Sequence, residues 1–262
     1  MKLRIVTATR GDSPHWPEAA ASIAAIGVEV DHLVVCPAER IAALQPAAPA
    51  ARFVAERSRG LYPALNQGLR EPGDWDAFTW LNDDDVLLPA GFASLVATLR
   101  RDARPDAAYG RVDLIDSHGA LIGALPVARR GSDLPALFAR GIMPLAQPGT
   151  VMRRAVWDDL QGLDESYRYA ADFDLFVRAI ARGCRFGHVS ARVAAFRLRA
   201  GQLSKQRIEV AAETRRALAV LQNVRPATAA WWRFRLGNFG VYAGRIRRHG
   251  WVSMRDLYDR TG

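Results

Sequence analysis

The feature that most constrains the fold is a regular alternation of short apolar runs with segments of helical pattern. Four runs have the length and composition of buried strands, at residues 3–8, 28–35, 52–55 and 77–81. Helical patterns, such as that at 61–69, separate them. This alternation predicts a parallel sheet whose ligands bind beyond the carboxyl ends of the strands. Polar clusters at 7–12, 56–60 and 82–85 accompany these strand ends, so we expect them at one edge.

The pattern changes after about residue 105. Residues 107–115 and 121–127 have the character of a hairpin, and a further strand is expected near 149–153. Helices are expected near 134–140, from 155 and over 172–182. Because no linker, repeat or low-complexity segment interrupts the chain before about residue 205, residues 1–204 are predicted to form one α/β domain.

Charge divides the chain at the same point. The formal net charge is +9, and residues 205–262 contain twelve Lys or Arg against four Asp or Glu, so the rest of the chain is nearly neutral. Helices are expected at 205–222 and 229–248. In the second helix, apolar residues recur at intervals of four and three, at Trp232, Leu236, Phe239, Ala243 and Ile246. Such a basic amphipathic helix is typical of contact with anionic lipid, although a stripe that packs on the domain or on a second subunit has the same pattern.

Cysteine usage and hydropathy bear on location. Cys36 and Cys184 are too few for a disulfide framework or a zinc site, which favours a reducing compartment. No run of about eighteen apolar residues occurs, and the N-terminus lacks the apolar stretch of a signal peptide. We therefore expect a cytoplasmic protein that is not an integral membrane protein.

Three consecutive carboxylates, Asp83, Asp84 and Asp85, follow the fourth expected strand. Adjacent carboxylates raise one another's pKa, so a cation or solvent must offset their repulsion. Mg²⁺ and Mn²⁺ prefer oxygen ligands and commonly bridge carboxylates to a substrate diphosphate. The cluster therefore indicates a metal site, and the alternative is an acidic turn that caps the following helix.

Two other segments contain candidate site residues. Gly60 precedes a helix N-terminus and has Arg57 and Arg59 beside it, which is a suitable arrangement for binding phosphate. Asp172 and Asp174 open an amphipathic helix. Carboxylates at this position can act in catalysis or simply cap the helix.

Taken together and in this order, the segments resemble glycosyltransferase family 2, the nucleotide-sugar transferases of the GT-A fold. The resemblance covers about residues 3–204. It rests on the sequences TATR (7–10), GLYPALNQG (60–68), LNDDD (81–85), QPGTVMRR (147–154), GLDE (162–165) and ADFDLFVR (171–178). It implies a mostly parallel, Rossmann-like sheet flanked by helices. Residues 1–105 would bind the nucleotide sugar, 106–204 would hold the acceptor and the catalytic base, and 205–262 would form a helical extension.

The resemblance also implies roles for single residues. Asp172 is the expected general base, with Asp174 as the second candidate, and Asp84 is expected to hold Mn²⁺ or Mg²⁺ beside Asp83 and Asp85. The residues expected to line the donor site are Thr7, Thr9, Arg10, Glu56, Arg59, Tyr62, Asn66, Asn82 and Asp83. Two positions depart from the family pattern: Pro63 replaces a frequent Asp, and Arg199 replaces a frequent His near the metal. An arginine cannot coordinate a cation.

We therefore expect an inverting glycosyltransferase that uses a nucleotide-sugar donor and a saccharide or lipid-linked acceptor in surface polysaccharide or glycolipid synthesis. It would be cytoplasmic and peripheral to the inner face of the membrane. One alternative is a GT-A-like nucleotidyltransferase, which should have a loop richer in Gly and Lys than residues 9–12. Another is a catalytically silent protein with a lipid- or nucleic-acid-binding tail. Because the tail lacks a nucleic-acid module, we expect no nucleic-acid partner.

Overall fold

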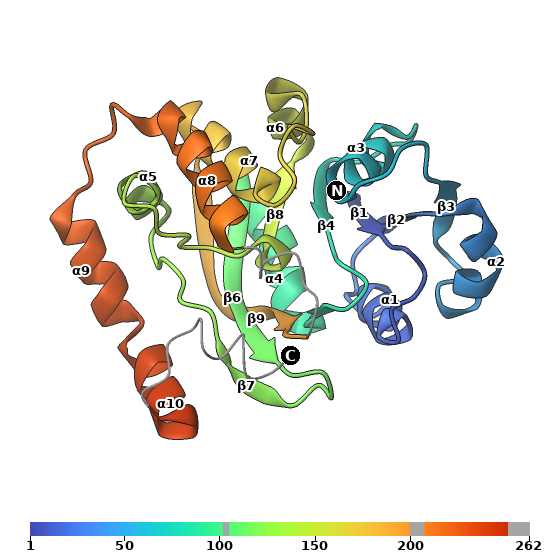
Figure 1. Cartoon of the computed structure of the whole chain (residues 1–262), viewed down its shortest axis with the longest axis horizontal. Helices are drawn as coiled ribbons and strands as arrows, with labels where there is room; N and C mark the ends of the chain where they lie inside the picture. The colour runs from blue at the N-terminus through green and yellow to red at the C-terminus, as the bar shows by residue number, and fades with distance from the viewer. Residues whose placement is uncertain (102–104, 200–206, 251–262) are drawn as a thin grey trace.

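One sheet of nine strands organises the part of the chain that the structure describes, residues 1–101, 105–199 and 207–250 (Figure 1). In this computed structural model the strand order is β3-β2-β1-β4-β8-β6-β9-β5, and β7 pairs with β6 off this path. The strands are β1 (Leu3–Ala8), β2 (Val30–Cys36), β3 (Arg52–Ala55), β4 (Ala77–Trp80), β5 (Val86–Leu87), β6 (Ala107–Ile115), β7 (Leu121–Ala124), β8 (Thr150–Arg153) and β9 (Phe186–Arg197). The α-helices are α1 (Trp16–Ala24), α2 (Ile41–Leu44), α3 (Leu61–Arg70), α4 (Pro89–Leu99), α5 (Leu134–Phe138), α6 (Arg154–Leu160), α7 (Ala171–Ala181), α8 (Arg207–Leu218), α9 (Thr228–Gly237) and α10 (Phe239–His249).

The first four strands are parallel, as the alternating sequence pattern predicts. β1 pairs with β2 on one side and β4 on the other, and β2 pairs with β3. In this register Val6 lies between Leu33 and Trp80, all three of them buried. Because the strands share one direction, the polar clusters that follow them meet at the carboxyl edge of the sheet.

The second half of the sheet is mixed. β8 is antiparallel to both β4 and β6, so β6 and its parallel neighbour β9 point in the same direction as β4. The expected hairpin is confirmed, with β7 ending at Ala124. Strand β9 is absent from the sequence-based prediction because its buried and exposed positions do not alternate regularly. Its carboxyl end brings Arg197 to the same edge as the polar clusters.

Both faces of the sheet are covered by helices. α3, α5, α6 and α7 pack on one face, whereas α1 and α4 pack on the other. Side chains alternate along a strand, so β1 contributes Val6 to the first core and Ile5 to the second. Burying an aliphatic side chain of this size contributes about 1.5–3 kcal/mol. These two side chains therefore anchor β1 between the two helix layers.

Two glycines determine how α3 meets the sheet. Gly60 caps the N-terminus of α3 with a φ of 128°, which residues with a Cβ rarely adopt. Gly68 faces β1 so closely that a Cβ there would lie 2.6 Å from the Cγ1 atom of Val6. The glycines of this segment therefore serve backbone geometry and close packing.

The C-terminal extension contains three α-helices in its described part, whereas the sequence predicts two. The expected helix over 229–248 is broken between α9 and α10 at Asn238, which is 2% exposed. The Asn238 side chain bonds the backbone N–H and C=O of Val127 at 3.0 and 2.9 Å, and thereby ties the break to the domain. None of the helices in the described ranges is long and apolar enough to cross a bilayer.

Candidate functional site

The acidic segment 82–85 lies where the carboxyl ends of β1, β4 and β9 meet. Thr9 follows β1 and donates its hydroxyl hydrogen to the Asp83 carboxylate. At the end of β9, the backbone N–H of Arg197 donates to Oδ1 of Asp85 at 2.9 Å. Residues from three distant parts of the sequence thus form one polar site at the predicted edge.

Asp83 and the loop after β1 form the first side of this site. The Thr9 hydroxyl also accepts the Gly11 N–H at 2.9 Å, and the Ser13 hydroxyl donates to the Asp83 carbonyl at 3.1 Å. Burial raises the pKa of Asp83 and the charge of Asp84 adds to this effect, while the Thr9 hydrogen bond opposes it. The loop is therefore held against the acidic segment by polar contacts.

Asp85 is fully buried. Besides the Arg197 N–H, it accepts a hydrogen bond from the Asn82 side-chain amide at 3.1 Å. Burial raises the pKa of Asp85 well above its usual range, and the neighbouring Asp84 charge raises it further. The Asp85 carboxylate therefore fastens the acidic segment to β9.

Two arginines from the end of β9 face the acidic segment. Arg197 is 1% exposed, and its guanidinium donates to the Asp84 carbonyl at 2.7 Å and to Glu18 at 2.5 Å. Arg199 forms an ion pair with the Asp84 carboxylate. Burial alone would lower the pKa of Arg199, but the hydrogen bond and charge of Asp84 outweigh it and raise the pKa. Both arginines thus offset the repulsion among the aspartates.

Each of the predicted metal ligands has a protein partner. Asp83 faces Thr9, Asp84 faces Arg199, and Asp85 faces the Arg197 backbone and Asn82. Within the described ranges, no group of three or more His, Cys, Asp or Glu side chains is arranged to hold a metal ion. The three aspartates therefore do not fit the metal site that the sequence predicts.

Asp172, the expected base, lies in the first turn of α7. Because α7 leads into β9, which is parallel to β4 within the sheet, the helix N-terminus lies at the same edge as the acidic segment. Oδ1 of Asp172 accepts the Phe173 N–H at 2.8 Å. Burial raises the pKa of Asp172 to about 6 against the lowering effect of backbone hydrogen bonds. Tyr62 of α3 lies beside it: burial, followed by the Asp172 charge, raises the pKa of Tyr62.

Glu213 of α8 fixes the segment that leads to Asp172. Its carboxylate accepts the backbone N–H groups of Arg168, Tyr169 and Ala170 at 2.8, 2.8 and 2.9 Å. The sequence-based prediction missed this residue, although Glu213 is one of only four acidic residues among the last 58. An acidic residue within a basic segment was the sequence feature that could have indicated this role.

Asp174, the second candidate base, has a structural partner. Its carboxylate pairs with Arg178 at 2.7 Å, and Arg178 also donates to the carbonyls of Leu160 and Gly162 at 2.8 and 2.9 Å. Asp174 therefore orients the arginine that ties α7 to the end of α6.

Two of the predicted donor-site residues, Asn66 and Thr7, make contacts within the fold. The Asn66 side chain is fully buried and bonds the backbone N–H and C=O of Leu163, as well as the Glu165 carboxylate, at 2.7–3.0 Å. Thr7 is also fully buried, and its hydroxyl pairs with Nε2 of His32 at 3.2 Å. Both side chains thus hold elements together.

Other predicted donor-site residues remain accessible. Arg10 and Arg59 are exposed, and Glu56 is half-buried at the end of β3, where its N–H bonds the Cys36 carbonyl at 2.8 Å. These side chains lie on loops that follow β1 and β3 at the carboxyl edge. Their positions agree with a role in ligand binding, which stays a prediction.

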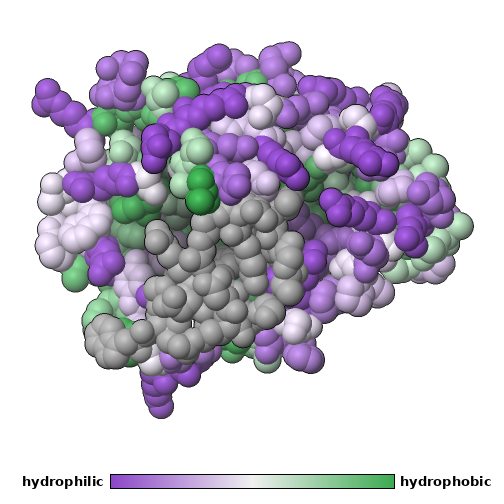
Figure 2. Space-filling model, in the orientation of Figure 1, coloured by the Kyte–Doolittle hydropathy of each residue, from purple (hydrophilic) through white to green (hydrophobic). Residues whose placement is uncertain are grey.

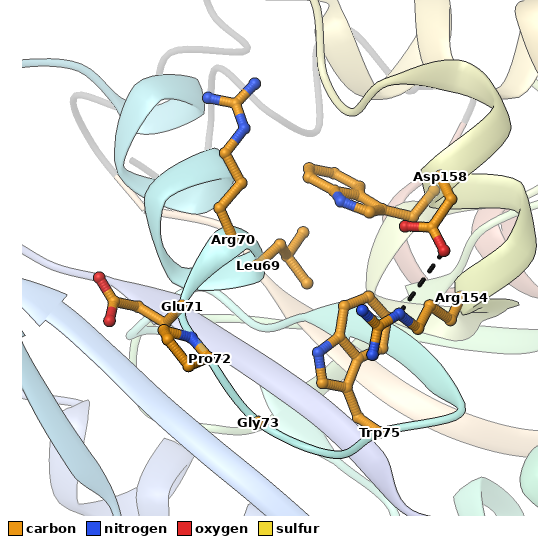
Figure 3. Close-up of a pocket in the computed structure, with 9 residues that line it drawn as sticks. Leu69, Arg70, Glu71, Pro72, Gly73, Trp75, Arg154 and Asp158 are labelled. Atoms are coloured by element: carbon orange, nitrogen blue, oxygen red, sulfur yellow. Dashed lines mark ion pairs between the residues drawn. The ribbon is translucent and has the colours of Figure 1, made fainter.

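A pocket of about 230 Å³ lies at the opposite edge of the sheet, between the end of α3 and the start of α6 (Figure 3). Trp75 forms one wall, and the Arg154 guanidinium lies 4.7 Å from the centre of a Trp75 ring. Arg154 also pairs with Asp158 at 3.5 Å. These contacts stabilise α6 against the sheet, and the pocket lies away from the polar cluster.

Known structures share this fold. No family model and no curated protein matches the chain. Residues 1–349 of the S. aureus glycosyltransferase TarS align with 95% of this chain and 72% of that one, at a TM-score of 0.64 and 14% identity. A longer TarS structure aligns with 98% of this chain, which spans only 45% of that protein, at a TM-score of 0.62 and 13% identity.

The mannosyltransferase PcManGT from Pyrobaculum calidifontis, determined in complex with GDP-Man and Mn²⁺, also aligns. The match covers 99% of this chain and 79% of that one, at a TM-score of 0.56 and 15% identity. These neighbours are glycosyltransferases. The chain therefore has the GT-A glycosyltransferase fold, as the sequence resemblance implies.

Proposed function

We propose that this chain is an inverting family 2 glycosyltransferase. It would move a sugar from a nucleoside diphosphate donor to a hydroxyl group of a saccharide or lipid-linked acceptor, in the synthesis of a surface polysaccharide or glycolipid. Support comes from the GT-A fold and from the polar site at its carboxyl edge. In PcManGT the same fold was determined with a nucleotide sugar and Mn²⁺.

The observation that carries the proposal is the placement of Asp172. Its pKa of about 6 leaves the carboxylate mostly ionised at neutral pH yet basic enough to accept a proton. Glu213 and the Phe173 N–H restrict its position at the sheet edge that also holds the acidic segment. A carboxylate with these properties suits general-base catalysis.

In the proposed reaction, Asp172 accepts the proton of the acceptor hydroxyl as that oxygen bonds the anomeric carbon. The bond from the anomeric carbon to the diphosphate breaks, and the nucleoside diphosphate leaves with the electron pair. Because attack occurs opposite the leaving group, the anomeric configuration inverts. No step is assigned to a metal ion, because the three aspartates do not fit the predicted site.

We also propose that the extension contacts a membrane surface from the cytoplasmic side. Trp232, Leu236 and Phe239, here called the apolar row, are 54%, 70% and 70% exposed, so this part of the stripe does not pack on the domain. Residues 214–250 contain eight arginines and no Asp or Glu. Hydrophobic patches lie among hydrophilic residues where α9 and α10 form one side of the molecule (Figure 2). Exposed aromatic and basic side chains on one helix favour anionic lipid.

Nucleotide-sugar binding and turnover test the enzymatic proposal. Thermal shift should show stabilisation of the chain by one nucleoside diphosphate, and by its sugar conjugates, from a panel of UDP, GDP, CDP, ADP and dTDP. Incubation with that conjugate should then release nucleoside diphosphate, and Asp172→Asn should bind the nucleotide but release none. Binding without turnover in the wild-type chain, across a panel of acceptors, would support the silent binding protein instead.

A further inference from the structure

We propose that the Arg199 guanidinium supplies the positive charge that meets the donor diphosphate, in the role that a divalent cation would otherwise fill. The inference rests on the proposed function and concerns the same site. The carboxylates of the expected metal ligands Asp83, Asp84 and Asp85 are each bonded to protein groups.

The position of Arg199 supports this role. It lies two residues after the end of β9, and its side chain is 41% exposed while it pairs with the Asp84 carboxylate. Arg197, two residues earlier, is buried and bonded to Glu18 and to main-chain carbonyls. Of these two arginines, Arg199 is therefore the one that solvent, and hence a ligand, can reach.

The chemistry of the side chain suits a diphosphate. A guanidinium is charged at every physiological pH and presents planar N–H donors that match phosphate oxygens. Negative charge from Asp12, Asp83 and Asp84 surrounds Arg199, which keeps the guanidinium oriented at the acidic segment. Asp84 would thus position Arg199 instead of holding a metal ion.

A divalent cation would have to compete with this arrangement. To reach Asp84, it would displace a guanidinium from a carboxylate that is only 5% exposed. Asp83 and Asp85 would also have to turn away from Thr9, Asn82 and the Arg197 N–H. Mg²⁺ requires near-octahedral oxygen geometry and gives up water reluctantly, so such a rearrangement offers it little.

The test is binding of the nucleoside diphosphate selected by thermal shift, measured by calorimetry in EDTA and in MnCl₂. The wild-type chain should bind with a dissociation constant that differs by less than about threefold between the two buffers. Arg199→Gln should bind about 10- to 100-fold more weakly in EDTA, since a charged hydrogen bond is worth about 1.5–3 kcal/mol. Arg199→His should recover affinity only with Mn²⁺. Arg215→Gln, an exposed change on α8, is the matched control and should bind like the wild type.

The outcomes separate the inference from the proposed function. If the wild-type chain binds nucleotide only with Mn²⁺, or if Arg199→Gln binds normally in EDTA, the role of Arg199 is wrong while the transferase proposal stands. If no nucleoside diphosphate binds in either buffer, the proposed function itself is contradicted. Melting temperatures of the variants show whether each is folded. If Arg199→Gln is not folded, Arg199→Lys, which keeps the charge, provides a second variant.

Discussion

Replacing Asp172 with Asn should stabilise the protein near neutral pH while it abolishes transfer. The pKa of Asp172 is raised from 3.8 to about 6 in the native state, mainly by burial. Between these values the native state binds more protons than the unfolded chain, so the free energy of unfolding falls as the pH rises through this window. Above about pH 6, where Asp172 is ionised, the full free-energy cost of burying its charge is present.

The magnitude follows from the size of the shift. A shift of about two units corresponds to about 3 kcal/mol at 1.36 kcal/mol per unit. The side chain is only half-buried, so solvent screening reduces the effect, and we expect Asp172→Asn to gain about 2 kcal/mol at pH 8. Asn retains the oxygen that accepts the Phe173 N–H, so the replacement mainly removes the charge.

Urea unfolding of both proteins at pH 5 and pH 8 measures this effect. Asp172 loses its proton in the native state about one pH unit above pH 5. The gain in the free energy of unfolding from Asp172→Asn should therefore be larger at pH 8 than at pH 5 by about 1–1.4 kcal/mol. Transfer by the variant should fall by about 100-fold or more, since the general base is lost. In the wild type, transfer should decline below about pH 6 as Asp172 is protonated.

Asp164→Asn provides a control of opposite sign. Burial raises the pKa of Asp164, but hydrogen bonds from Ser166 and the charge of Arg216 outweigh burial and lower it overall. The native state is thus stabilised by this charge above the unfolded pKa of Asp164, and removing the charge should destabilise the protein at pH 8. The reasoning about Asp172 is refuted if Asp172→Asn is no more stable than the wild type at pH 8, or if its advantage does not grow with pH.

Three further predictions address the surroundings of the site and the extension. Glu213→Ala removes the acceptor of three backbone N–H groups, so it should slow transfer and speed hydrogen exchange at 168–170 while nucleotide affinity is kept. Glu209→Ala, an exposed change on the same helix, should neither slow transfer nor speed this exchange. Asn66→Ala leaves the buried N–H and C=O of Leu163 without these partners and should lower the free energy of unfolding by about 2–3 kcal/mol in urea titrations. Serine substitutions throughout the apolar row should abolish flotation with vesicles of phosphatidylglycerol and phosphatidylcholine, whereas Ile208→Ser, which alters an 82% exposed side chain on α8, should not.

The parallel half of the sheet was predictable because β1, β2 and β4 contain continuous runs of buried residues. Burial on both faces selects continuous apolar runs, and the helices between them show a period of about 3.6 residues. Strand β9 lacks such a signature: only one stretch of three consecutive residues, 193–195, is buried throughout. Its pairing with β6 depends on contacts between residues about 80 positions apart, which local patterns do not encode.

The composition of the acidic segment was predictable, but the direction of its side chains was not. Sequence spacing puts Asp83, Asp84 and Asp85 together after β4. Their partners Arg197 and Arg199 lie 112–115 residues further along the chain. Without β9 in the prediction, a metal ion was the simplest source of positive charge for three carboxylates. The strand that the prediction missed supplies that charge from the protein itself.

The extension illustrates why net charge alone is a poor guide to the role of a segment. Its excess of arginine suggests a tail separate from the chemistry, yet the acidic Glu213 of α8 holds the residues that precede Asp172. The buried residues of α9 and of the break after it are Ala230, Phe234 and Asn238, and they leave the apolar row exposed. If α8 sets the position of the base and α9 meets lipid, one segment links the catalytic residue to the surface at which an acceptor would arrive. Loss of the apolar row should then impair use of vesicle-bound acceptors and spare transfer to soluble ones, whereas loss of Glu213 should impair both.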